Sequence, residues 1–316
     1  MNAFLGELGK KIAERWVTVL VLPGLLWAAT ALLATQLGWS HALSPHTLAD
    51  QITPWAKETH PVGVIVVVLA GLLLASIAAG LAATVLGVMA RHLWITRGRW
   101  PPAHWLTTWR QHRWRTADNH VNTLVAEAIR ASGPSPPDPA TDVTTASPVV
   151  VAGPGMAEAL ARRDAISLEF PERPLWISDR WRGNAIRIRR AYGVDITLVW
   201  PRLWTVLPES LRTDLTAAQT AYAAASSLMG WAALYGVLGI CWWPALLISV
   251  AVIITGTLRA RTATTVLCQL IETAADLHCH TLAEQLQLRC PGPLTIDVGN
   301  QINTLLRKDP PPTYSP

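Results

Sequence analysis

The side chains best suited to bind a metal lie near the carboxyl end of the chain: Asp276, His278, Cys279 and His280. Asp276 and His280 are four residues apart and share one face if the segment is helical, but His278 then points to another side. The sequence has no Cys-x-x-Cys pair that could complete a tetrahedral set. We therefore predict no metal site, because zinc needs three or four protein ligands at one point.

Other catalytic patterns are also missing from the sequence. It contains no Gly-rich phosphate loop, no nucleophile elbow and no Ser, His and Asp grouping of the kind that activates a nucleophile. We predict a protein that is not an enzyme and that binds no cofactor.

The strongest chemical signal is the run of arginine and tryptophan at residues 91–115, which has no acidic residue. Indole rings prefer the headgroup boundary of a bilayer, where arginine meets anionic lipid. Arginine and aromatic rings also bind nucleic acid, but lipid explains a segment that directly follows an apolar span more simply. The residues predicted to bind anionic lipid headgroups or a cytoplasmic protein partner are Arg97, Arg99, Trp100, Trp105, Trp109, Arg110, Arg113, Trp114 and Arg115.

A second arginine cluster lies between residues 180 and 190 and could receive an anionic ligand. Acidic residues close by in the sequence favour a different interpretation, a solvated face of ion pairs. These acidic residues are Glu169, Glu172, Asp179 and Asp195.

The elements that must position these residues are mostly membrane spans. Residues 61–90 contain no ionisable side chain, and a helix of roughly 20 apolar residues already crosses a bilayer. The composition, with 51% hydrophobic and 15% charged residues, also favours a multi-pass membrane protein. We predict four spans in two hairpins, at residues 16–37, 62–90, 217–240 and 243–258.

Basic residues flank one end of these spans. Lys10, Lys11 and Arg15 precede the first span, Arg91 follows the second, and Arg259 follows the fourth. Because positively charged flanks stay on the cytoplasmic side, both termini and the region 91–216 are predicted to be cytoplasmic.

Small residues recur every four positions along the second span, and the third span offers a matching pair. Such stripes let two helices approach closely, and we favour packing within one chain over contact in a homo-oligomer. The predicted packing residues are Gly71, Ala75, Ala79, Ala83, Gly87, Ser226 and Gly230.

Charged residues are absent from the interior of the predicted spans, which disfavours a transporter coupled to ions. Polar residues such as Ser226 and Thr255 could line a pore formed by several copies, although interhelical hydrogen bonding explains them more simply. An oligomeric channel or pore-forming effector, gated through the cytoplasmic domain, is the alternative function.

The predicted fold is mainly α, with a small α(+β) cytoplasmic domain inserted between the hairpins and a C-terminal amphipathic helix. The predicted order begins with an N-terminal amphipathic segment and the first transmembrane hairpin (1–90), a basic Trp-rich juxtamembrane helical region (91–131) and a flexible Pro-rich linker (132–155). It continues with a cytoplasmic α+β unit (156–216), the second transmembrane hairpin (217–258), and a cytoplasmic helix with a disordered Pro-rich tail (259–316). In the α+β unit we expect strands at 165–170 and 196–200. We also expect a helix that Ser178 caps and Gly193 ends.

Three segments carry a resemblance to a known family: Arg173-Pro-Leu-Trp-Ile-Ser-Asp-Arg-Trp-Arg-Gly-Asn, Tyr192-Gly-Val-Asp195 and Trp200-Pro-Arg-Leu-Trp204. They are similar to a family of uncharacterised bacterial multi-pass membrane proteins common in actinobacteria. The resemblance covers about residues 91–244 and implies a cytoplasmic domain joined to hairpins in the inner membrane, with no activity attached. We therefore expect a non-enzymatic inner-membrane scaffold or regulatory protein that presents a basic cytoplasmic domain to anionic lipid or to a protein partner.

Overall fold

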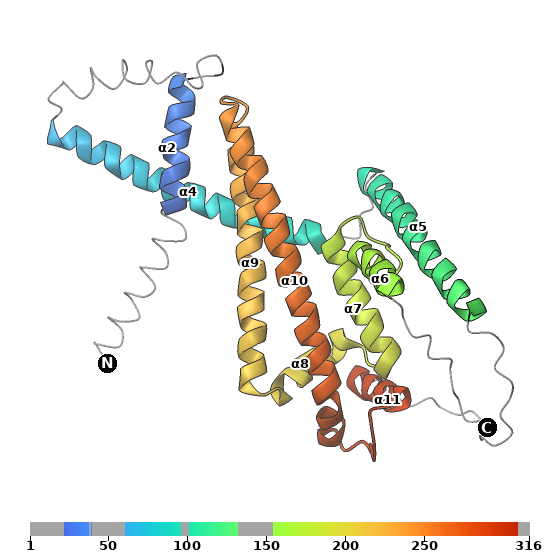
Figure 1. Ribbon diagram of the computed structural model, residues 1–316. Helices are drawn as coiled ribbons and strands as arrows, with labels where there is room; N and C mark the ends of the chain where they lie inside the picture. Colours follow the sequence, from blue (N-terminus) through green and yellow to red (C-terminus); the bar gives the residue numbers. More distant parts are fainter. Residues whose placement is uncertain (1–21, 38, 40–60, 96–100, 132–153, 309–316) are drawn as a thin grey trace, which may run out of the picture. The chain divides into compact units, whose positions relative to one another are not determined.

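The computed structural model describes residues 22–37, 39, 61–95, 101–131 and 154–308 (Figure 1). Within these ranges the secondary structure is helical, and no strand occurs. The helices are α2 (Leu22–Leu37), α4 (Val62–Ile95), α5 (Pro101–Ala131), α6 (Pro154–Ile166), α7 (Trp176–Tyr192), α8 (Ile196–Val206), α9 (Glu209–Leu238), α10 (Pro244–Gln285) and α11 (Ile296–Arg307).

Three of these helices, α4, α9 and α10, are long and apolar enough to cross a membrane. They correspond to the second, third and fourth predicted spans. The described part of the first predicted span is α2, which has 16 residues and a length of roughly 24 Å; residues 16–21 lie outside the described residues. The chain therefore has the helices of a membrane protein.

The chain divides into two compact units. Unit 1 comprises Met1–Leu93 and Gln219–Ala263, and unit 2 comprises Trp94–Ala218 and Thr264–Pro316. The predicted boundaries at residues 90, 217 and 258 lie close to these. Most of the predicted linker, 132–153, lies outside the described residues, and Pro154 already begins α6.

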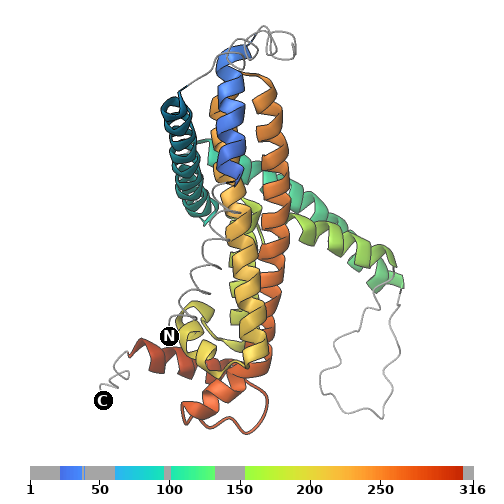
Figure 2. The same cartoon turned by 90° about the vertical axis from the view of Figure 1, so that its left-hand side faces the viewer.

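In unit 1, α9 and α10 run side by side as a tight hairpin (Figures 1 and 2). The Ser249 hydroxyl of α10 donates to the Ala232 carbonyl of α9 at 2.7 Å. Helix α2 packs against α4 so closely that a Cβ on Gly24 would lie 2.6 Å from the Ser76 hydroxyl oxygen. Small side chains therefore set the spacing of these helices.

In unit 2, α5 and α6 pack through a small apolar core. Val121 of α5 is buried against Met156 and Ala159 of α6, and Leu124 and Leu160 pack around them. This contact determines which face of α5 packs on α6 and which side chains of α5 remain exposed.

Helix α7 ends at Gly193 as predicted but does not begin as predicted. Gly193 has φ 68° and donates its N–H to the Arg189 carbonyl, which closes the helix in the left-handed conformation that favours glycine. Leu175 occupies the N-cap position without a side-chain hydrogen bond. Ser178 lies inside the first turn and donates to the Leu175 carbonyl, so the prediction that it caps the helix was wrong.

Both predicted strands were wrong. Residues 196–200 form the first turns of α8, and α6 extends to Ile166 before an irregular segment. The β-branched residues of α8 suggested a strand, but Ile196, Val199 and Leu203 are buried at helical spacing. The Asp195 side chain caps this helix by accepting from the Thr197 backbone N–H.

Helix α11 lies beyond the predicted C-terminal helix, where no further helix was predicted, and the Pro-rich end predicted to be disordered lies outside the described residues. Thr295 caps it, and Val298, Ile302 and Asn303 are buried. The Asn303 side chain donates to the Gly193 carbonyl at 2.7 Å and accepts from the Asp195 N–H at 2.9 Å. This side chain therefore ties α11 to the joint between α7 and α8.

Candidate functional site

The outer face of α5 carries three exposed residues of the predicted lipid-binding set. Trp105 is 72% exposed and Trp109 is 48% exposed, and their four-residue spacing puts them on one side of the helix. Arg113 continues this line, and its guanidinium carbon lies 5.0 Å from the centre of the Trp109 ring. We call Trp105, Trp109 and Arg113 the α5 outer face.

Arg110 has a different role from the predicted one. It is 7% exposed, and its guanidinium donates to the Asp179 carboxylate at 2.6 Å and to the carbonyls of Arg173 and Ile166. A guanidinium with this many acceptors inside the protein is not available to a headgroup. The inclusion of Arg110 in the lipid-binding set is therefore corrected, because this side chain fastens α5 to α7.

Asp179 is the buried partner of this ion pair. It is 2% exposed and also accepts the backbone N–H groups of Glu172 and Arg173. Burial raises the pKa of the Asp179 carboxyl, and the positive charge of Arg110 opposes this shift. The carboxylate thus depends on Arg110 for its charge balance.

Trp114 and Arg115 pack within unit 2. The Trp114 indole N–H donates to the Ser167 carbonyl at 3.0 Å, and its ring meets Phe170 edge-on at 5.6 Å. The Arg115 guanidinium carbon lies 5.2 Å from the centre of the Phe170 ring. Arg97, Arg99 and Trp100 lie outside the described residues. Of the predicted residues that the structure describes, Trp105, Trp109, Arg113 and Arg115 are exposed, and the Arg115 guanidinium is directed to the Phe170 ring.

A pocket of about 380 Å³ lies between α5 and α6 beside the α5 outer face. His112, Thr116 and His120 line it from α5 at four-residue spacing, together with Arg113, and Arg162 lines it from α6. Ala117, Ala159 and Ile166 form its apolar wall. The sequence patterns did not predict this pocket, although the spacing of the two histidines and Thr116 places them on one helix face.

The arginines of α7 are mostly paired, as the alternative of a solvated face requires. Arg182 pairs with Glu172, Arg187 with Glu272 at 3.1 Å, and Arg190 with Glu169 at 2.9 Å. These pairs compete with any anionic ligand on this face.

Part of the small-residue stripe lies at a helix crossing within unit 1. A Cβ on Gly87 of α4 would lie 2.9 Å from the Ser226 carbonyl oxygen of α9, and a Cβ on Gly230 would overlap the Ala83 carbonyl oxygen. Ala79 and Ala83 are buried. These residues hold α4 and α9 in close contact.

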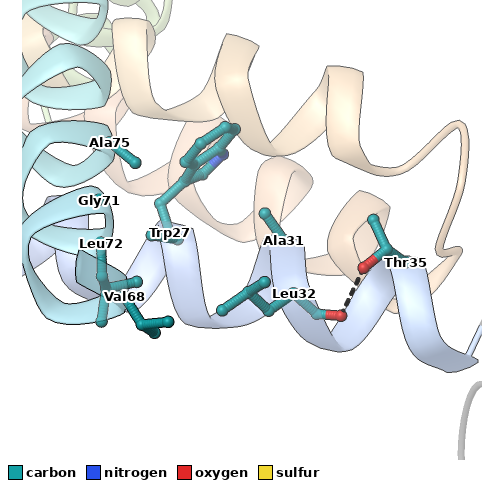
Figure 3. A pocket seen from close by; sticks show the side chains of 9 residues that line it. Trp27, Ala31, Leu32, Thr35, Val68, Gly71, Leu72 and Ala75 are labelled. Atoms are coloured by element: carbon teal, nitrogen blue, oxygen red, sulfur yellow. Dashed lines mark hydrogen bonds between the residues drawn. The ribbon is translucent and has the colours of Figure 1, made fainter. Parts of the chain in front are cut away.

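Gly71 and Ala75 lie instead at an apolar pocket of about 390 Å³ between α2 and α4. Figure 3 shows Trp27, Ala31 and Leu32 of α2 opposite Gly71 and Ala75 of α4. Gly71 has no heavy atom within 4 Å of a Cβ built on it. The stripe therefore has a packed half and an open half.

Hydroxyl groups in the spans mostly bond to their own helices. Ser226 donates to the Ala223 carbonyl, and Thr255 and Thr257 donate to carbonyls one turn earlier. Such internal bonds satisfy these donors without water.

The cysteines and the candidate metal ligands have separate surroundings. Cys279 is fully buried, and burial raises its pKa to about 12; Asp276 accepts from the Tyr192 hydroxyl. Among the residues that the structure describes, no group of three or more His, Cys, Asp or Glu side chains could hold a metal ion.

The chain was compared with protein-family models, with curated proteins and with solved structures. No family model, curated protein or solved structure matches the chain.

Proposed function

We propose that this chain is a non-enzymatic scaffold or regulatory protein of the bacterial inner membrane, whose cytoplasmic unit 2 binds anionic lipid through the α5 outer face. The observation that carries this proposal is the exposure of Trp105 and Trp109 beside Arg113. Large apolar side chains exposed together mark a surface that meets another phase or partner.

The chemistry of the face fits a lipid headgroup region. Indole rings are stable at the boundary between hydrocarbon and water, where their apolar body is buried and their N–H still finds an acceptor. Among the described residues, Arg113 has no carboxylate partner. Its charge therefore remains available to the phosphate of an anionic lipid, with a gain of roughly 1 kcal/mol near a charged surface.

The basic residues that flank the spans support a cytoplasmic unit 2. Arg91 ends the apolar part of α4, and Arg259 and Arg261 follow the apolar part of α10. The positive-inside rule puts these flanks, and hence unit 2, on the side of the membrane that carries anionic lipid.

Site-directed spin labelling of the full-length protein in nanodiscs tests this proposal. A label at the exposed Thr108, between the two tryptophans, is introduced after replacement of Cys241 and Cys290 by serine, because Cys268 and Cys279 are buried. We expect the label to collide with oxygen more often than with a water-soluble nickel chelate in discs of anionic lipid. The double variant Trp105→Ala and Trp109→Ala should reverse this preference.

Two controls make the result specific. The same label at Thr123, also exposed on α5 and roughly 22 Å farther along the helix, reports a position that lacks neighbouring tryptophans. Discs of zwitterionic lipid remove the charge attraction while they keep the hydrocarbon. A Thr108 label that remains in water in both kinds of disc would rule out the proposed surface.

A further inference from the structure

The pocket between α5 and α6 gathers cationic and donor side chains from two helices. His112, Arg113 and His120 come from α5, and Arg162 comes from α6 on the other side. Residues four apart on a helix are separated by roughly 6 Å along its axis, so His112, Thr116 and His120 present a continuous column of donors. The residues that line the pocket, as far as the structure describes them, include no carboxylate.

Arg113 keeps its hydrogen-bond donors for a ligand. Its guanidinium contacts the Trp109 ring at 5.0 Å, and such a contact uses the charge but none of the in-plane N–H groups. Two arginine forks at one pocket match the oxygens of a phosphate group, which accepts paired hydrogen bonds.

Arg162 has a partner that it can exchange. It pairs with Glu158 at 2.7 Å, but both side chains are about two-thirds exposed, at 69% and 66%. Exposed pairs of this kind are weak because water screens them. A phosphate in the pocket therefore competes with Glu158 for the Arg162 guanidinium.

The wall of the pocket explains why there is room for a ligand. Ala117 and Ala159 contribute only methyl groups at the helix contact, and Ile166 closes the apolar side. The volume of about 380 Å³ falls in the range of small-molecule sites. It accommodates a phosphate together with a glycerol-sized group.

From this geometry we propose that the α5–α6 pocket binds the phosphate group of a phosphorylated ligand, held by Arg113 and Arg162 with His112, Thr116 and His120 as further donors. The inference deepens the proposed function and rests on it for the source of the ligand, because the α5 outer face would bring the pocket to anionic headgroups. A soluble organic phosphate has the same binding chemistry, and the experiment separates the two sources.

The test measures binding to the full-length protein in nonionic detergent micelles. The probes are short-chain phosphatidic acid, short-chain phosphatidylcholine and inorganic phosphate, titrated by microscale thermophoresis. We expect saturable binding of phosphatidic acid that Arg113→Gln and Arg162→Gln each weaken about tenfold or more, which corresponds to the loss of one charge-assisted hydrogen bond.

Two further variants are included, one expected to tighten binding and one that serves as a control. Glu158→Gln releases Arg162 from its ion pair and should tighten binding. Arg130→Gln removes the same charge from an exposed position in the last turn of α5 and should leave binding unchanged. All four positions are exposed, and melting curves of each variant verify that the fold is retained.

The possible outcomes test the location of the binding site and the source of its ligand separately. Binding of inorganic phosphate that competes with the lipid and follows the same variants supports the pocket and assigns a soluble ligand. Binding that Arg113→Gln and Arg162→Gln do not change, or that Arg130→Gln weakens equally, overturns the pocket. The Thr108 spin label in Arg162→Gln then tests the membrane surface separately, since Arg162 is not part of the α5 outer face.

Discussion

At the scale of single residues, the arginines of α5 look alike in the sequence, but they differ in burial and in the residues that they contact. Arg110 and Arg113 are three positions apart in the same basic run. Arg110 faces α7 and is buried with Asp179, whereas Arg113 faces outward. A buried charge must be paired to be stable, so Arg110 contributes to the fold while Arg113 remains free to meet a ligand.

Replacement of Arg110 by alanine should destabilise unit 2 strongly. Asp179 would remain buried without a cation, and a broken buried ion pair costs about 3–5 kcal/mol. Hydrogen exchange of the α5 and α7 amides in the full-length protein measures the loss. The matched variant Arg113→Ala should change stability by less than about 0.5 kcal/mol, since its side chain is exposed. Equal losses in both variants would contradict a special role for Arg110.

The contribution of Asp195 to the stability of the joint between α7 and α8 depends on pH. The hydrogen bond from the Thr197 hydroxyl to Asp195, at 2.5 Å, holds the pKa of this carboxyl below its usual value. A carboxyl with a lowered pKa stabilises the folded state above its unfolded pKa, and this contribution disappears as the pH falls through the folded pKa.

The variant Asp195→Ala should therefore lose about 1 kcal/mol at pH 7, the usual cost of an N-cap. The difference from the unsubstituted protein should shrink as the pH falls below about 3.9, the ordinary pKa of an unfolded aspartate, toward the lowered pKa of the native carboxyl. Unfolding curves recorded from pH 7 to pH 3 measure both values. A difference that grows in acid would show that the carboxylate does not stabilise the joint.

At the scale of helices, close contact depends on positions where a side chain is missing. Gly230 of α9 meets the backbone of Ala83 in α4, and Gly299 of α11 meets the backbone of Tyr192 in α7. Gly71 and Gly292 have open space around them. The same residue type thus marks a packed position in one place and an unconstrained one in another.

The substitution Gly230→Ala should weaken unit 1 because the added methyl group overlaps the Ala83 carbonyl oxygen. Overpacking of this kind costs about 1–3 kcal/mol. Unfolding in mixed micelles with increasing denaturing detergent gives the change. Gly71→Ala adds the same methyl group to α4 where nothing lies within 4 Å, and it should unfold like the unsubstituted protein.

The substitution Gly299→Ala should detach α11 from the end of α7. Its methyl group overlaps the Tyr192 carbonyl oxygen, and the Asn303 hydrogen bonds to Gly193 and Asp195 depend on the same approach. We expect the α11 amides to exchange at least tenfold faster, which corresponds to about 1.4 kcal/mol. Gly292→Ala is the control, and unchanged protection in both variants would mean that α11 does not need this contact.

At the scale of the whole molecule, the long helices carry the chain from one unit into the other. Helix α10 has 42 residues and a length of roughly 63 Å, about twice the thickness of a bilayer core. Its first part belongs to unit 1 and its last part to unit 2. In the proposed topology, the turn at Cys241 lies outside and the segment at Cys290 inside the cell.

Single-cysteine variants test this topology in vesicles of known orientation. Cys241 is exposed in the turn after α9, Cys290 is half-buried after α10, and Cys268 and Cys279 are buried. A maleimide that cannot cross membranes should label Cys241 from the outside and Cys290 only after permeabilisation. Cys279 serves as the control, because burial raises its pKa to about 12 and leaves little thiolate at neutral pH. Labelling of Cys290 from the outside would reverse the orientation.

The sequence alone determined the elements whose signals are local. The uncharged run at 61–90 and the apolar stretches at 217–240 and 243–258 predicted α4, α9 and part of α10, because a bilayer demands a long apolar helix. Gly193 predicted the end of α7, because glycine adopts the left-handed conformation at little cost. These features depend on neighbouring residues in the chain.

Only the tertiary structure decided the features that depend on distant partners. The β-branched residues at 196–200 became helical because α8 buries one helical face, and α11 formed where it could dock on α7. Arg110 is buried with its ion-pair partner Asp179, which is 69 residues away in the sequence. The α5–α6 pocket is lined in part by Arg162, which belongs to another helix. Burial and ion pairing arise from contacts between separated segments, so a single sequence read by its local patterns does not reveal which arginine meets an acid and which meets solvent.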